Sequence, residues 1–274
     1  MPAFICTTCG TQYPPSEAPP AHCPICEDER QFLRPEGQSW TTLERLRISH
    51  HNGFRQHEPG LIGIGTTPAF AIGQRALLLC TPEGNILWDC VSLIDDATVT
   101  LINGLGGLRA IAISHPHFYT TMVDWSRAFG GVPVHLHADD AKWVRQPDDC
   151  IKFWRGERFE LLKGITLVHG GGHFAGGSML HWAAGAGGKG VVCSADIAMA
   201  NLDRKSFTFM RSIPNFIPLS EKTVRGIGAA LMPFAFDRVY SHFFERVIQS
   251  DAKRILQNSV ERYVAAISGA YDGV

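Results

Sequence analysis

A short apolar segment that ends in two closely spaced histidines constrains this chain more than any other feature. Residues 111–114 read Ile-Ala-Ile-Ser, and His115, Pro116 and His117 follow directly. Such an apolar run is typical of a short buried strand. Two histidines at positions i and i+2 beyond its end can direct both imidazole rings into one cavity. Because imidazole is a common ligand of zinc, iron, nickel and copper, the pattern indicates a transition-metal site.

Four cysteines near the N-terminus form two pairs with the same internal spacing. Cys6 and Cys9 form the first pair, Cys23 and Cys26 the second, and the pattern is C-x2-C-x13-C-x2-C. The two-residue spacing lets a tight turn aim both sulfurs at one ion, and two such turns complete a tetrahedral thiolate site. A module this small needs the metal for its folding energy, so we expect a structural zinc ion. Iron is the alternative, because the pairs also look like rubredoxin knuckles.

A polar link with glycine and proline separates these cysteines from the rest of the chain. It covers residues 31–40, and links of this composition are common at domain boundaries. We therefore expect a four-cysteine zinc-ribbon-like module at residues 1–35 and one large domain at residues 40–274. Residues 13–20, which are rich in proline, are expected to form a stiff loop without strand or helix.

Strand-like and helix-like patterns alternate through the large domain. Strands are expected at residues 70–73, 76–80, 86–91, 110–114, 132–136, 158–162, 164–168, 178–183, 190–194 and 238–240. Helices are expected at residues 97–105, 122–129, 138–144, 223–231 and 249–267. Hairpins come first, strands alternating with helices follow, and the same order then repeats. This order indicates two sheets covered by helices.

Three further candidate metal ligands each lie just beyond a strand-like run. His173 lies in a glycine-rich segment, where the backbone can wrap closely around an ion. Asp196 follows the apolar residues 191–195, and His242 follows residues 239–241. One such residue alone would more often be a hydrogen-bonded histidine or a turn aspartate. Their recurrence at strand ends favours a shared metal site.

Together these residues resemble the metallo-β-lactamase superfamily over residues 60–265. The histidine pair looks like the start of its HxHxDH motif, and residues 169–178 look like its HTPGHTPGS segment, whose second histidine is a ligand. The resemblance implies an α+β fold, the αββα sandwich, with the metals at one edge and hydrolysis by metal-activated water. The residues that match the family's ligands are His115, His117, His173, Asp196 and His242.

The chain departs from this family at one place. Where the motif has Asp-His, Tyr119 and Thr120 stand here. The resemblance implies that these positions are central to the second metal site, so we expect a single ion rather than two. Asp124, one turn into the following helix, is a weak candidate to replace the lost acid.

A hydrolase with one metal ion is the first functional hypothesis. Three neutral imidazoles on zinc leave a position for a water whose pKa falls toward 7. Asp196 is expected to orient or deprotonate that water. Tyr119 is expected either to donate a hydrogen bond to a developing oxyanion or to be structural. The expected substrate is a small-molecule ester, lactone, thioester or phosphoester.

Two other hypotheses stay open. His115, His173 and Asp196 would also form a two-histidine, one-carboxylate iron site, which resembles the use of this fold by persulfide dioxygenases. Alternatively, the chain is a binding or scaffold protein without catalysis, because the motif is incomplete. The sandwich metal is accordingly expected to be zinc or iron.

The composition narrows the choice of partners and compartment. The net charge of −1 argues against nucleic acid as a partner. No stretch has the length and apolarity of a membrane span, and the N-terminus lacks a signal-peptide pattern. We expect a cytoplasmic protein, and the sequence does not predict its oligomeric state. Among the other histidines, His169 is expected either to support the site or to be structural, and His181 is expected to be packed in a strand.

Overall fold

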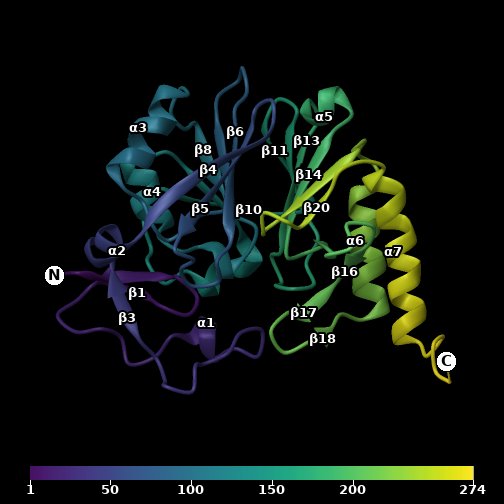
Figure 1. Ribbon diagram of the computed structural model, residues 1–274, viewed down its shortest axis with the longest axis horizontal. Helices are drawn as coiled ribbons and strands as arrows, with labels where there is room; N and C mark the ends of the chain where they lie inside the picture. Colours follow the sequence, from purple (N-terminus) through teal and green to yellow (C-terminus); the bar gives the residue numbers. More distant parts are fainter. Residues whose placement is uncertain (274) are drawn as a thin grey trace. The chain divides into compact units, whose positions relative to one another are not determined.

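The computed structural model describes residues 1–273 of the chain (Figure 1). The chain divides into two compact units, Met1–Trp154 and Arg155–Val274. Each unit is built on one large β-sheet with helices packed against it. Both units carry residues that the sequence predicts to bind metal. The predicted boundary between a four-cysteine module and a larger domain stays a prediction.

The first unit begins with a small antiparallel sheet around the cysteines. Its strand order is β2 (Gln12–Pro15), β1 (Ala3–Cys6), β3 (Trp40–Thr42), and α1 (Pro24–Glu27) carries the last cysteine. The prediction that residues 13–20 contain no strand is wrong for its first three residues, because Pro15 pairs with Ala3 in β2. Proline is tolerated there because β2 is an edge strand, where a missing N–H disrupts no ladder.

The large sheet of the first unit has seven strands. Their order is β10 (Ile151–Trp154), β9 (Val134–His137), β8 (Ala110–Ala112), β7 (Ile86–Trp88), β6 (Arg75–Leu79), β5 (Leu61–Thr67), β4 (His51–Glu58). Strands β4 to β7 pair antiparallel and β7 to β10 parallel. The crossovers of the parallel part contain α3 (Asp96–Gly104) and α4 (Met122–Ala128). Right-handed crossovers that progress in one direction place both helices on the same face, as Figure 1 shows.

Several short elements complete this unit, and one predicted strand is absent. They are α2 (Leu43–Ser49) and the 3-10 helices η1 (Pro116–Phe118) and η2 (Ala138–Trp143). The prediction of a strand at residues 70–73 is wrong. These residues form a turn in which the N–H of Gly73 donates to the oxygen of Phe70 at 2.9 Å. The φ angles of Ala71 (53°) and Gly73 (75°) lie outside the range of a β-strand.

The second unit contains a six-stranded sheet with two long helices. The strand order is β11 (Arg158–Leu162), β12 (Ile165–His169), β13 (Ser178–Trp182), β14 (Val191–Ala195), β19 (Arg238–Ser241), β20 (Val247–Ile248). Two short hairpins, β15 (Met199–Ala200) with β16 (Phe207–Thr208) and β17 (Met210–Ser212) with β18 (Ile217–Pro218), lie outside this sheet, as does the single turn α5 (Gly185–Gly188). The helices α6 (Glu221–Leu231) and α7 (Ala252–Ile267) lie side by side (Figure 1).

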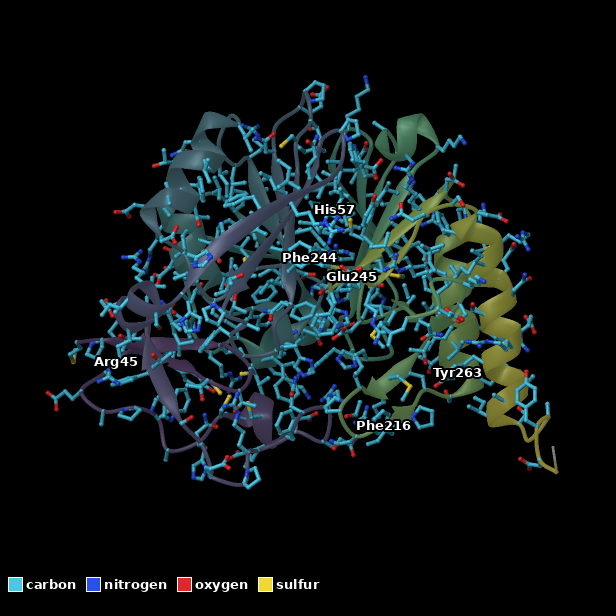
Figure 2. The ribbon with its side chains drawn as sticks, in the orientation of Figure 1. Arg45, His57, Phe216, Phe244, Glu245 and Tyr263 are labelled. Atoms are coloured by element: carbon cyan, nitrogen blue, oxygen red, sulfur yellow. The ribbon has the colours of Figure 1, made fainter. Side chains whose placement is uncertain are left out.

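The core of the second unit lies between its sheet and these helices. Val224 and Ile227 of α6 are buried in one cluster with Leu256 and Val260 of α7, at the helical spacing that creates an apolar face. Tyr263 of α7 (Figure 2) also fixes the segment before α6 through its hydroxyl, which accepts a hydrogen bond from the N–H of Leu219 at 3.0 Å. Within residues 1–273, no helix has the length and apolarity to cross a membrane.

Candidate metal centre

The four N-terminal cysteines converge on one point inside the first unit. All four are buried, and their sulfur atoms lie within 4.8 Å of one another. Sγ of Cys6 is 3.5 Å from Sγ of Cys26, and Sγ of Cys9 is 3.7 Å from Sγ of Cys23. A tetrahedron with Zn–S bonds of about 2.3 Å has edges of about 3.8 Å. The four sulfurs therefore fit a zinc ion, as the spacing predicted.

The hydrogen bonds around these sulfurs favour a thiolate at Cys6. Hydrogen bonds from the thiols of Cys23, Cys26 and Cys9 lower the pKa of Cys6 below its ordinary value. The side-chain amide of Gln38 also donates to Sγ of Cys6 at 3.1 Å. Thiolate is the form that binds a metal, and Cys6 already favours this form.

The histidine pair lies where the sequence predicted, beyond the end of β8. His115 has an extended backbone and precedes η1, which contains His117. Both side chains are buried, and their ring centroids are 5.1 Å apart. Two imidazoles at this separation can share one ion.

A buried carboxylate orients the first of these histidines. Oδ1 of Asp89 accepts hydrogen bonds from the main-chain N–H and from Oγ of Ser114, each at 2.8 Å. Oγ of Ser114 is also 2.8 Å from Nδ1 of His115. Because the hydroxyl proton points to Asp89, the serine oxygen accepts from Nδ1–H. The coordinating lone pair of His115 is therefore on Nε2.

The residues that replace Asp-His in the motif are buried. The hydroxyl of Tyr119 lies 3.5 Å from the main-chain oxygen of Asp140. Burial, with a smaller effect of the Asp140 carboxylate, raises the pKa of Tyr119 well above its ordinary value, so the phenol is neutral. Thr120 has a φ of 38°, which is rare for a β-branched residue. Its main-chain oxygen accepts a hydrogen bond from the N–H of Gln12 at 3.0 Å.

In the second unit, the glycine-rich segment between β12 and β13 presents His173. Nδ1 of His173 lies 3.1 Å from the main-chain oxygen of Met210. A carbonyl oxygen can only accept, so Nδ1 carries the proton and Nε2 the lone pair. The segment needs glycine at position 172, where φ is +79° and a Cβ would lie 2.8 Å from Cδ1 of Leu219. The glycine thus lets the segment pack against Leu219, and the oxygen of Met210 holds the ring of His173.

Asp196 and His242 lie close to His173 within the same unit. Asp196 follows β14, and its Oδ2 lies 3.8 Å from Nε2 of His173. Nδ1 of His242 contacts Oδ1 of Asp196. The three strand-end residues predicted for this part of the chain are thus brought together, and all three are buried.

The remaining histidines lie as follows. Nε2 of His169 is 2.7 Å from the oxygen of Ala175, so it braces the glycine-rich segment. His181 is buried in β13 with Nε2 2.8 Å from the oxygen of Ala235, which confirms that it is packed. No pattern had pointed to Asp89 or Met210. Asp89 directly follows β7, but the strand predicted at residues 86–91 runs past it, so the strand-end rule did not select this residue.

Comparisons with known proteins identify a relative and a fold. No protein-family model matches the chain. "Uncharacterized protein YmaE" of Bacillus subtilis (strain 168) is 44% identical over 270 residues, which cover 98% of this chain and 98% of that protein.

Solved structures of metallo-β-lactamases superpose on most of the chain. The crystal structure of VMB-1 has a TM-score of 0.58 at 11% identity, covering 79% of this chain and 98% of its own. The DIM-1 metallo-β-lactamase has a TM-score of 0.56 at 12% identity, with the same coverage of 79% and 98%. A B3 metallo-β-lactamase with an active site glutamic acid has a TM-score of 0.51 at 16% identity, covering 82% and 94%. The predicted fold is confirmed: this chain has the metallo-β-lactamase fold and belongs to one family with YmaE.

Proposed function

We propose that this protein is a metal-dependent hydrolase that acts on a small-molecule ester, lactone, thioester or phosphoester. The main support for the proposal is the tautomer of two imidazole rings. His115 and His173 each donate from Nδ1 to a neighbouring oxygen, which places the lone pair on Nε2. Histidine ligands are held in this way at metal sites.

In this proposal His115, His117 and His173 bind one ion, and Asp196 lies beside it. The histidine pair belongs to the first unit and the other two residues to the second, so their sharing of an ion is itself part of the proposal. The metallo-β-lactamase fold supports it, because the resemblance implies metals at one edge of that fold. Zinc is the ion we expect, with three imidazoles and one exchangeable position.

When bound, the ion polarises a substrate oxygen and lowers the pKa of a water. Asp196 is the side chain we assign to orient that water and to hold its proton. The contact of Asp196 with His242 fixes the carboxylate. In a one-ion site we therefore assign His242 the role of positioning Asp196 rather than that of a metal ligand. We assign Tyr119 a structural role rather than that of a hydrogen-bond donor to an oxyanion, because its phenol is buried and its hydroxyl lies near the main-chain oxygen of Asp140.

The same substitution at two buried histidines tests this proposal. His173→Gln should lower hydrolysis of a panel of esters, lactones, thioesters and phosphoesters by more than about a hundredfold and release the ion of this site. His181→Gln is the control, because His181 is also buried and its Nε2 lies 2.8 Å from the main-chain oxygen of Ala235, outside the proposed ligand set. Full hydrolysis by His173→Gln, or equal losses in both variants, would contradict the proposal.

An iron oxygenase is the second candidate. The 3.8 Å between Nε2 of His173 and Oδ2 of Asp196 suits a two-histidine, one-carboxylate site. Iron in the purified protein, with oxygen consumption on a persulfide and no hydrolysis, would favour it. Absence of any ion at these residues would favour the binding or scaffold role.

A further inference from the structure

The loop after the first cysteine pair contacts the segment that follows the histidine pair, and both lie in the first unit. Gln12 stands three residues after Cys9. Its main-chain N–H donates to the oxygen of Thr120 at 3.0 Å. Its side-chain Nε2 donates to Oδ2 of Asp124 at 2.8 Å. Gln12 thus holds residues 119–124 at two points.

Ser92 makes a further connection between the same two places. Its Oγ donates to the main-chain oxygen of Gly10 at 3.0 Å, and its own main-chain oxygen accepts from Oγ1 of Thr121 at 2.9 Å. A Cβ on Gly10 would lie 2.3 Å from Oγ of Ser92, and its φ is +81°. Only glycine allows this approach, so the cysteine loop is fitted closely to its neighbour.

The held segment contains an unfavourable backbone conformation. Thr120, with its φ of 38°, turns the chain between η1 and α4. A β-branched residue stays in such a conformation only when its surroundings impose it. Gln12 and Thr120 are both buried, so the hydrogen bond between them is shielded from water and can impose that turn.

We propose that Gln12 is a positioning residue, through which the four-cysteine module sets the conformation of residues 119–124. The module's loop depends on the ion that joins its cysteines, since structural zinc supplies the folding energy of such modules. Residues 119–124 directly follow the segment that contains His117, so the loop also supports the histidine pair. The support of the histidine pair as metal ligands rests on the proposed function. The hydrogen bonds of Gln12 to Thr120 and Asp124 do not depend on it.

Hydrogen exchange of the full-length protein tests the connection without substrate. Gln12→Ala removes the bond to Asp124, and amides of residues 119–125 should exchange about tenfold faster, the effect of losing one buried, charge-assisted hydrogen bond. The N–H of Trp125, which donates to the oxygen of Thr121, is the clearest reporter. Gln56→Ala, at an exposed position of β4, is the control for the loss of a glutamine side chain elsewhere and should leave that rate unchanged.

Reversing donor and acceptor separates positioning from general damage. Gln12→Glu places a carboxylate against Asp124 and should speed exchange at least as much as Gln12→Ala. Adding Asp124→Asn to Gln12→Glu lets the new amide donate to the new carboxylate, and should restore slow exchange. Unchanged exchange in Gln12→Ala and Gln12→Glu, or no recovery in the double variant, would overturn the proposal.

The role of the ion in the four-cysteine module is tested in the same assay. Cys9→Ser should speed exchange of residues 119–125, and adding Gln12→Ala should have no further effect, because Gln12 has already lost its support. Fully additive effects would overturn the link between the module and this segment. Because exchange is read without turnover, a protein that hydrolyses nothing can still pass this test, and an active one can fail it.

Discussion

The buried carboxylate of Asp89 determines how His115 is oriented, through the hydroxyl of Ser114. This relay uses two residues next to strand ends, and it converts a histidine at the end of β8 into one with a defined tautomer. Outer partners of this kind typically change metal affinity by 10–100-fold when they are removed. At the scale of single residues, the proposed metal site therefore includes Asp89 and Ser114, which orient a ligand without binding the ion.

Ser114→Ala should lower the affinity of the histidine site for zinc by about 10–100-fold, since Nδ1 of His115 loses its acceptor. Competition with a chromophoric chelator measures this. Ser126→Ala is the control, because Ser126 is also buried and donates to the oxygen of Val132 away from the histidines. It should lower the free energy of unfolding by about 1 kcal/mol and leave zinc affinity unchanged. Equal zinc affinities in the two variants would contradict the assigned relay.

The candidate ligands were predictable from the sequence, because each one follows a predicted strand or belongs to a pair with a spacing typical of metal ligands. His115, His173 and Asp196 belong to this group. Their hydrogen-bond partners were not predictable in the same way. Met210 lies 37 positions from His173 and contributes only a main-chain oxygen, which carries no sequence signal.

At the scale of elements, the glycine-rich segment between β12 and β13 leaves little room for side chains at its glycine positions. The N–H groups of Gly170 and Gly171 both donate to the oxygen of Gly177. A Cβ on Gly177 would lie 2.6 Å from Cδ1 of Ile197. Glycine is therefore required by space at position 177, and by its dihedral angle at position 171, where φ is +64°.

Two glycine-to-alanine substitutions should have opposite signs. Gly172→Ala should destabilise the protein by more than about 1 kcal/mol, because φ is +79° and Leu219 and Ile227 are in the way. Gly226→Ala should stabilise it by about 0.5–1 kcal/mol, because Gly226 lies inside α6 with open space around its Cβ position. Urea unfolding at constant zinc measures both. Equal effects of the two variants would contradict this description of the segment.

Elements with a strong period were predictable, and those without one were not. The hairpin of β11 and β12 and the helix α7 were expected close to their observed bounds. The edge strand β4, which reads His-Asn-Gly-Phe-Arg-Gln-His-Glu, carries polar residues on both faces and shows no alternation to detect. The apolar residues 70–73 looked like a strand, but their positive φ angles cannot be read from composition.

At the scale of the whole molecule, we propose two separate metal centres in one chain. We propose that the four-cysteine cluster is structural and that it supports residues 119–124 through Gln12. We assign the proposed chemistry to the histidine centre, and because of the altered motif we expect one ion there. The two centres differ in ligand type, so each can be removed without changing the ligands of the other.

The zinc content per chain tests the presence of these two centres. Elemental analysis of the full-length protein, loaded with zinc and freed of loosely bound metal, should give about two zinc ions per chain. His173→Gln should give about one, with the four-cysteine site intact by the thiolate absorption of its cobalt form. One ion in the unaltered protein, three ions, or two ions retained in His173→Gln would contradict the account.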